Sequence, residues 1–134
     1  MLIDSFFSFG LFFFTAIGVL VLFLYLYALV TPYDDYKLIF QENNTAAAIG
    51  FGGAILGLCI PLYSALINSA SYVDFLIWAA VAMSVQLIFA FVIIRLNAKF
   101  SFEKQIENGV ISVSVLMAFL SVSIGLLNAG SMSY

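Results

Sequence analysis

The residue types that usually perform catalysis are almost absent from this sequence. Its 134 residues contain no histidine and a single cysteine, Cys59, which stands within an apolar stretch. Nucleophilic catalysis needs a base beside the nucleophile, and a metal site needs several ligands, so no catalytic residue, metal site or cofactor is predicted. Glu103 and Glu107 are one helical turn apart, but they belong to a charged segment that we expect to be solvated. The sequence therefore indicates that the protein is not an enzyme.

Neutral polar side chains within the apolar stretches are the remaining groups that could do chemistry. We single out four of them as a candidate polar site: Ser64, Asn68, Gln86 and Asn128. Buried amides and hydroxyls in membranes commonly join helices by hydrogen bonds. The alternative is that they line a hydrophilic path or a ligand pocket, which would be favoured if Asn68 and Asn128 occupy matching places in two halves of the chain.

The elements that must position these groups are four apolar segments. Of the residues, 65% are hydrophobic and only 8% are charged, a composition outside the range of soluble domains. Each uncharged run can supply the ~20 residues that cross a ~30 Å hydrocarbon core. We predict transmembrane helices near residues 6–30, 45–65, 75–94 and 110–128. The predicted fold class is an all-α membrane protein, and the lipid bilayer is its first expected partner.

The positive charges predict how these helices are oriented. All four cations, Lys37, Arg95, Lys99 and Lys104, lie between the first and second or the third and fourth predicted helices. Lysine and arginine accumulate in the cytoplasmic loops of membrane proteins. We therefore expect both charged segments in the cytoplasm and both termini outside. The net charge of −3 gives no reason to expect a nucleic-acid partner.

The two halves of the chain resemble each other. A shift of 64 residues aligns Ala54 with Ala118 and brings the first helix onto the third and the second onto the fourth. Because each half has an even number of spans, both halves would insert in the same direction. We predict a parallel duplication of a two-helix unit, with repeats at 1–70 and 71–134. The two asparagines of the candidate polar site match only if the second copy has lost four residues, about one helical turn.

Small residues mark the helix faces that are expected to pack. The stripe in the second predicted helix consists of Ala46, Gly50, Gly53, Gly57 and Pro61, at intervals of three or four residues. The fourth helix has a thinner stripe: Ser114, Ser121 and Gly125. Small residues let two helix backbones approach closely in lipid. We therefore expect the second and fourth helices at the centre and the first and third, which carry bulkier residues, outside.

Two asparagines stand just before predicted helices. Asn44 precedes the second helix and Asn108 the fourth. An asparagine at this place usually accepts a hydrogen bond from a free backbone N–H of the first turn. We predict that both are helix caps; a binding role is the alternative.

Several short motifs are similar to those of a known family. Asn43-Asn44-Thr45-Ala46-Ala47, Ile60-Pro61-Leu62 and Ile67-Asn68 resemble the bacterial YjfL-like inner-membrane proteins, and the resemblance covers nearly the whole chain. That family carries a tandem domain of unknown function with two predicted spans per copy. The resemblance implies a small multi-pass protein of the bacterial inner membrane, with no catalytic residues to carry over. It also implies a link to envelope stress, because such proteins are found beside envelope-stress genes.

Two functions fit these observations. The first is an oligomerising interaction or scaffold component, which forms a homo-oligomer or recruits a membrane or cytoplasmic protein partner. The alternative is a subunit of an oligomeric channel or transporter with a path lined by serine and asparagine. Transport by the purified protein would distinguish the second function from the first.

Overall fold

The computed structural model describes residues 1–96 and 102–132, and every regular element in these ranges is an α-helix. The long helices are α1 (Leu2–Val30), α3 (Thr45–Asn68), α4 (Tyr72–Leu96) and α6 (Ile111–Ser131), and the short ones are α2 (Asp35–Phe40) and α5 (Phe102–Glu107). Each long helix is long and apolar enough to cross a membrane. The predicted all-helical membrane fold with four spans is confirmed.

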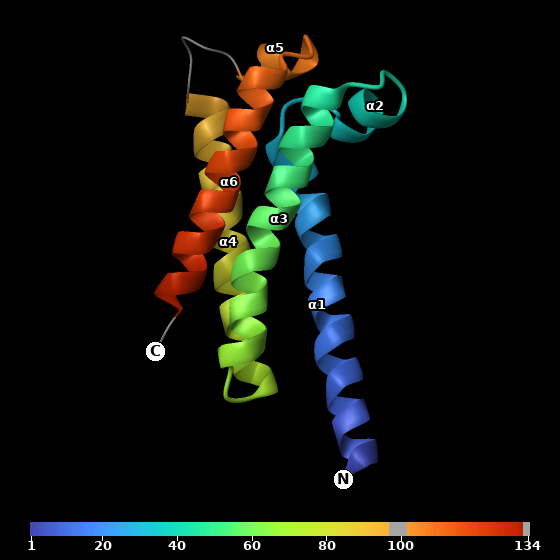
Figure 1. Cartoon of the computed structure of the whole chain (residues 1–134), viewed down its shortest axis with the longest axis vertical. Coiled ribbons are helices and arrows are strands. Elements are labelled where there is room, and N and C mark those ends of the chain that lie inside the picture. Colours follow the sequence, from blue (N-terminus) through green and yellow to red (C-terminus); the bar gives the residue numbers. More distant parts are fainter. Residues whose placement is uncertain (97–101, 133–134) are drawn as a thin grey trace.

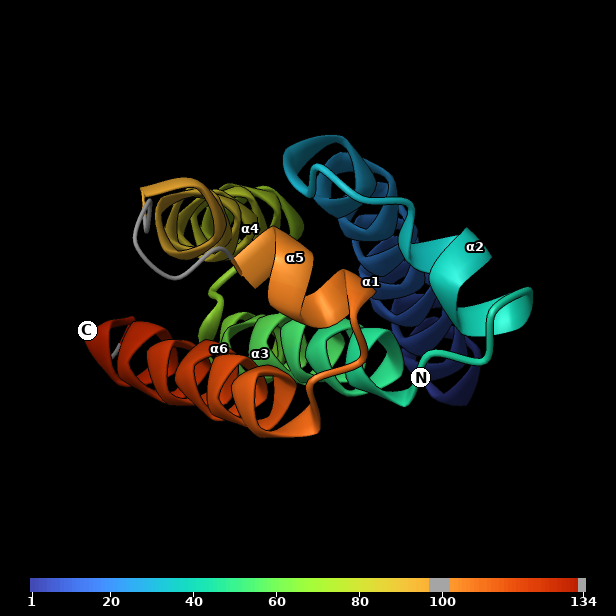
Figure 2. The same ribbon diagram turned by 90° about the horizontal axis from the view of Figure 1, so that it is seen from above.

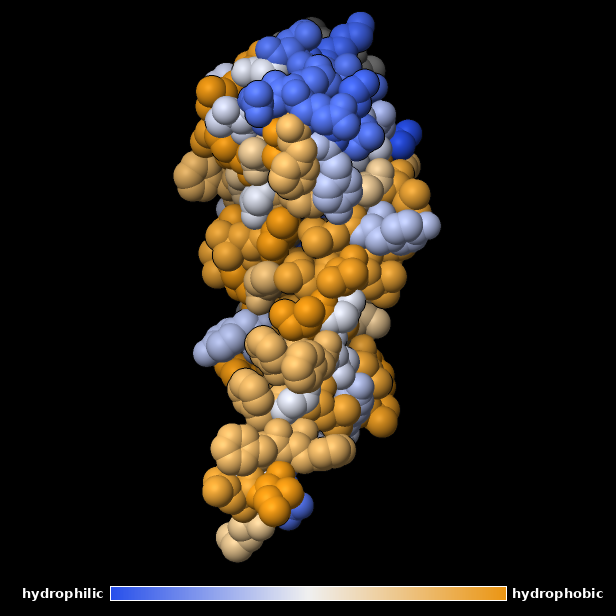
Figure 3. All heavy atoms as spheres, turned by 90° about the vertical axis from the view of Figure 1, so that its right-hand side faces the viewer, coloured by the Kyte–Doolittle hydropathy of each residue, from blue (hydrophilic) through white to orange (hydrophobic). Residues whose placement is uncertain are grey.

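The long helices alternate in direction, so that α3 and α6 run parallel to each other (Figure 1). Both chain ends lie at one end of the bundle, and α2 and α5 lie at the other, where hydrophilic residues gather (Figure 3). Lys37 and Lys104 belong to these two short helices, and Arg95 to the last turn of α4. Lys99 lies outside the described residues. The placement of this end in the cytoplasm and of both termini outside stays a prediction.

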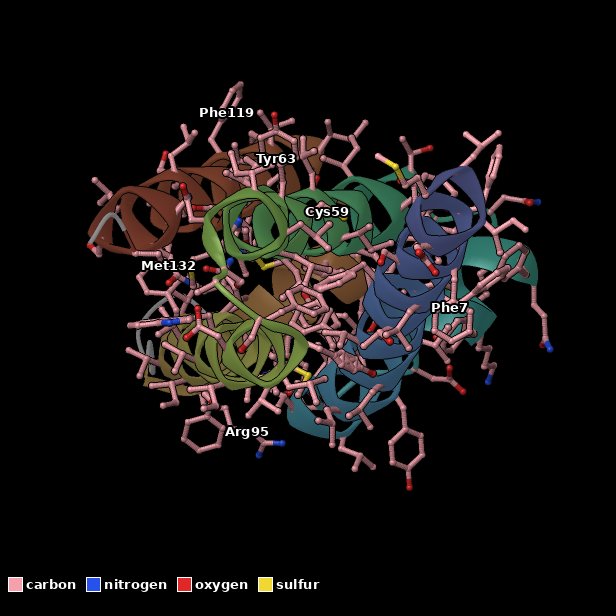
Figure 4. All side chains as sticks on the ribbon, turned by 90° about the horizontal axis from the view of Figure 1, so that it is seen from below. Phe7, Cys59, Tyr63, Arg95, Phe119 and Met132 are labelled. Atoms are coloured by element: carbon pink, nitrogen blue, oxygen red, sulfur yellow. The ribbon has the colours of Figure 1, made fainter. Side chains whose placement is uncertain are left out.

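Helix α3 is the central element of the bundle. It packs along α6, and these two helices lie side by side. Helices α4 and α1 lie next to each other across from this pair (Figure 2). Helix α6 is at the edge, because its far face has no neighbour among the residues that the structure describes: Phe119 is 67% exposed and points away from the bundle (Figure 4). The expectation that the second and fourth helices share the centre is therefore wrong for the fourth. Each half has the order long, short, long helix, but the duplication itself stays a prediction.

Helix α1 packs at its second half and is largely exposed at its first. Phe23 and Tyr27 are buried against the other helices. Around the middle of α1, the Thr15 hydroxyl lies 2.8 Å from the Tyr72 hydroxyl of α4. Phe12 also packs on the ring of Tyr72, whereas other large apolar side chains of this half, such as Phe7 and Phe14, are about 70% exposed. One face of the first half of α1 therefore faces whatever surrounds the protein in the membrane.

The starts of α3 and α6 differ in how they are capped. Asn44 is the N-cap of α3, and its Oδ1 accepts a hydrogen bond from the Ala47 N–H at 3.1 Å, so this predicted cap is confirmed. Helix α6 has Val110 at its N-cap, which offers no side-chain hydrogen bond. The predicted cap at Asn108 is wrong, because Gly109 turns the chain first: its φ of 73° is a left-handed conformation that costs glycine little.

Candidate functional site

The glycines of α3 and α6 bring two helix backbones into contact. A Cβ atom added at Gly53 would lie 2.5 Å from the Ala118 Cα, and one added at Gly57 would lie 2.6 Å from the Ser121 carbonyl oxygen. A Cβ at Gly125 would collide with the Gly57 carbonyl oxygen. Ordinary contacts between non-bonded atoms are about 3.5–4.0 Å. The two helices therefore touch where neither has a side chain to move aside.

The other residues of the small-residue stripes are also buried. A Cβ at Gly50 would collide with the end of the Met117 side chain. Ala46, Pro61 and Ser114 are inaccessible to solvent or nearly so, and the Ser114 hydroxyl donates to the Ile111 carbonyl of its own helix at 2.8 Å. The stripe of α3 thus points into the bundle along the length of the helix.

Gln86 and Asn128 meet between α4 and α6. Both are buried, with 4% and 9% of their surfaces exposed. Gln86 Nε2 donates to the Ser121 carbonyl at 3.2 Å, while Asn128 Nδ2 donates to the Ala82 carbonyl at 3.3 Å and to Gln86 Oε1 at 3.5 Å. A Cβ at Gly57 would lie 2.9 Å from Gln86 Nε2. The missing side chain at Gly57 therefore makes room for the amide that joins α4 to α6.

Asn68 does not belong to this network. It is exposed at the end of α3, and its Nδ2 donates to the Ser64 hydroxyl at 3.1 Å. The Ser64 hydroxyl in turn donates to the Ala129 carbonyl of α6 at 3.1 Å. Asn68 and Asn128 therefore lie in different surroundings, since Asn68 is exposed at the end of its helix and Asn128 is buried between α4 and α6. Their correspondence in two repeats stays a prediction.

The polar groups of the interior are occupied by one another and by backbone. Across residues 1–96 and 102–132, no buried side-chain nitrogen or oxygen lacks a hydrogen-bond partner, and no group of three acidic, cysteine or histidine residues could hold a metal. Three hollows open on the surface of the described part of the chain. One of about 590 Å³ lies along α1, and two of about 190 and 360 Å³ lie at the end formed by α2 and α5. The amides and hydroxyls of this interior network can fix helices in place.

A second buried polar group, at the end of α1, is absent from the sequence-based site. Asp35 is only 2% exposed, and its Oδ2 accepts a hydrogen bond from the Thr31 hydroxyl at 2.9 Å. Burial raises the pKa of Asp35 to about 6; the hydrogen bond from Thr31 lowers it and the nearby charge of Asp34 raises it. Burial, with the charge of Asp35, also raises the pKa of Tyr33. The spacing of Thr31 and Asp35 could have indicated this contact, but acidic residues in a charged segment are usually solvated.

Comparisons with known proteins place the chain among small membrane proteins. A family described as "Domain of Unknown Function (DUF350)" matches residues 1–132. The chain is 34% identical over 133 residues to the UPF0719 inner membrane protein YjfL of Escherichia coli (strain K12), covering 99% of this chain and 98% of that protein. It is 30% identical over 109 residues to the UPF0719 transmembrane protein YshE of Bacillus subtilis (strain 168), covering 81% of each. No solved structure matches the chain.

Proposed function

Because the chain belongs to the DUF350 family and is a multi-pass protein of the bacterial inner membrane, we propose that it is an oligomerising interaction or scaffold component of that membrane. It has no catalytic activity of its own and acts through the proteins that it holds together. The observation that carries this proposal is the exposed face of the first half of α1, where large apolar side chains such as Phe7 and Phe14 have most of their surface uncovered by the described chain.

The exposed face of the first half of α1 has the shape of a helix-packing surface. Gly10 has no atom within 4 Å of the place where its Cβ would be, and it forms the floor of a hollow of about 590 Å³. The walls of this hollow are large side chains, among them Phe6, Phe7 and Phe14. Helices associate in lipid chiefly where small residues let another helix come close. We infer that this hollow receives a side chain from α1 of a second copy.

The hydrogen bonds inside the bundle favour this proposal over a transport path through a single copy. The amides of Gln86 and Asn128 and the hydroxyl of Ser64, which a path would need, are used in hydrogen bonds between helices. Glycine backbones close the contact between α3 and α6. A channel would therefore have to run between copies. If the protein is a scaffold, neither single copies nor the assembled protein should show flux.

Cysteine cross-linking in membrane vesicles tests the proposal. In a Cys59→Ala background, Gly10→Cys should form a disulfide-linked dimer on mild oxidation, because the two α1 helices would face each other. Ile88→Cys is the matched control: Ile88 is 64% exposed on α4, away from the exposed face of the first half of α1. Little dimer is expected from it. Equal cross-linking at both positions would indicate random collision, and no cross-linking at Gly10→Cys would refute the proposed contact.

Flux measurements separate the scaffold from the channel. Liposomes that contain the purified protein should be no more permeable to ions and small solutes than empty liposomes. A reproducible flux that changes in Asn128→Leu would favour the alternative function, a subunit of an oligomeric channel or transporter. Proteins that co-purify with the cross-linked dimer would identify a membrane or cytoplasmic partner and would test a link to envelope stress.

A further inference from the structure

The chain turns sharply between α1 and α2, and the side chain of Asp35 is buried inside this corner. The Thr31 hydroxyl lies 2.9 Å from Asp35 Oδ2 and 3.3 Å from the carbonyl oxygens of both Ala28 and Tyr33. Thr31, Tyr33 and Asp35 are each less than 10% exposed. One hydroxyl thus lies within hydrogen-bonding distance of the last turn of α1, the connecting segment and the first turn of α2. The carboxyl of Asp35 is the group of α2 that takes part in this contact.

Among the described residues, the groups that act on this carboxyl include no cation. They are the Thr31 hydroxyl and the negative charge of Asp34, whose own side chain is exposed and accepts from the Lys37 N–H at 3.2 Å. The phenols of Tyr27 and Tyr33 also lie within electrostatic range of Asp35, and neither can carry a positive charge. Transferring an ionised carboxylate from water to such a place is unfavourable unless a positive charge accompanies it.

In residues 1–96 and 102–132, the elements around the corner do not bring a positive charge to Asp35. Helix α5 contributes Glu103 and Glu107, which act on Tyr33 with the same sign as Asp35. Lys104 of the same helix is exposed and is not among the groups that shift the pKa of Asp35. Helix α3 meets the corner through the ring of Phe51, which packs on Tyr27 and Tyr36. In α4, the guanidinium of Arg95 donates instead to the Val30 carbonyl, at 3.2 and 3.3 Å. In α2 itself, Lys37 is exposed and lines an outer hollow with Glu42 and Glu107.

We propose that Asp35 is a proton-binding site that controls the α1–α2 corner. The protonated, uncharged carboxyl remains buried and holds α2 against the end of α1. The ionised carboxylate draws α2 toward water and loosens the corner, because charge is stable only where it is solvated. Under the predicted topology this corner faces the cytoplasm, so the position of α2 reports cytoplasmic pH. The proposal does not depend on the oligomeric state.

The direction and size of the effect follow from the two states of the carboxyl. Its pKa is about 6 in the closed corner and would return to about 3.8 when α2 is free. The closed form therefore binds more protons than the open form. The extra stability that this proton gives to the closed form is lost as pH rises through about 6. These two values make closing about tenfold more favourable at pH 5 than at pH 8.

Hydrogen–deuterium exchange of the whole protein in lipid nanodiscs measures this opening directly. After correction for the intrinsic pH dependence of exchange, the peptide that covers residues 33–41 should lose about tenfold in protection between pH 5 and pH 8. Asp35→Asn keeps the shape of the neutral acid and cannot ionise, so its protection should be the same at both pH values. Asp34→Asn is the matched control, because asparagine caps helices as well as aspartate does. It should still lose protection as pH rises, with a midpoint at somewhat lower pH, because the charge of Asp34 raises the pKa of Asp35.

Two further measurements keep the proposal open to refutation. Thr31→Val removes a hydrogen bond that favours the ionised form, so the midpoint of the change should move to higher pH; a merely structural role for Thr31 would leave the midpoint in place. If Asp35→Asn does not accumulate, infrared spectroscopy of the unchanged protein should still find a carboxylic acid that ionises near pH 6. The proposal is overturned if no carboxyl ionises above pH 5, or if Asp35→Asn keeps the pH dependence.

Discussion

Replacing Gly57 by alanine should weaken the bundle far more than one added methyl group usually does. The new Cβ would lie 2.6 Å from the Ser121 carbonyl oxygen and 2.9 Å from Gln86 Nε2. The first neighbour is backbone of a parallel helix, and the second is an amide already held by a hydrogen bond to the same carbonyl. Neither can move aside without parting α3 from α6 or breaking the link from α4.

The expected cost follows from the size of this displacement. Atoms that are not bonded pack best at about 3.5–4.0 Å, so α3 and α6 must separate by on the order of 1 Å. Added methylene groups in packed cores usually cost about 1–3 kcal/mol. Because the obstacle here is backbone, we expect the cost of Gly57→Ala in unfolding free energy to lie at the upper end of this range, about 3 kcal/mol. The matched control is Gly52→Ala on the exposed face of the same helix, where no atom lies within 4 Å of the new Cβ.

Unfolding in mixed micelles of mild detergent and SDS, followed by the fluorescence of Trp78, measures this difference. Gly57→Ala should unfold at a much lower SDS fraction than the unchanged protein. Gly52→Ala should be unchanged or more stable by up to about 1 kcal/mol, since alanine favours the helix over glycine. If both variants unfold at the same SDS fraction, the close contact between α3 and α6 is not a source of stability.

Three other predictions concern the amide network, the caps and the topology. Gln86→Leu and Asn128→Leu should each lower the free energy of unfolding by about 1–2 kcal/mol, and the double variant by less than the sum, because the two side chains interact; strictly additive losses would contradict the network. Asn44→Ala should lower the free energy of unfolding by about 1 kcal/mol by removing the cap of α3, whereas Asn108→Ala should change it by no more than about 0.5 kcal/mol. Equal unfolding curves for the two variants would argue against this difference. Reporter enzymes fused at either terminus should report the periplasm, and reporters placed in α2 or α5 the cytoplasm; a cytoplasmic terminus would overturn the topology.

The spans could be predicted because length and apolar composition alone decide whether a helix crosses a bilayer. Their ends could not be placed from the charges. Helix α1 begins at Leu2, so Asp4 lies in its first turn. Asp74 likewise lies in the first turn of α4 and accepts a hydrogen bond from the Ala70 N–H at 2.9 Å. Carboxylates stabilise helix starts, and a boundary drawn at each charge therefore shortens the helix. The short helices α2 and α5 were missed because six residues are too few to show a helical period.

The residues of the candidate site could be predicted from the sequence, but the contacts between them could not. The spacing of the glycines placed Gly53 and Gly57 on one face, since helical geometry is local. The meeting of Gln86 with Asn128 depends on how α4 and α6 are aligned, which no local pattern determines. Asp35 was missed for a similar reason: it is adjacent to an exposed acid, and only the turn after α1 removes it from water.

The number of copies in the native membrane tests the central proposal most directly. Native mass spectrometry can weigh the protein in nanodiscs cut from the membrane with its own lipids, without detergent. The account predicts particles that hold at least two copies of the 14.7 kDa chain, with or without a second protein, and fewer such particles when Gly10 is replaced by leucine to fill the hollow on α1. A single copy with no bound protein, in particles that retain their lipid, would contradict the proposal that this protein acts by holding others together.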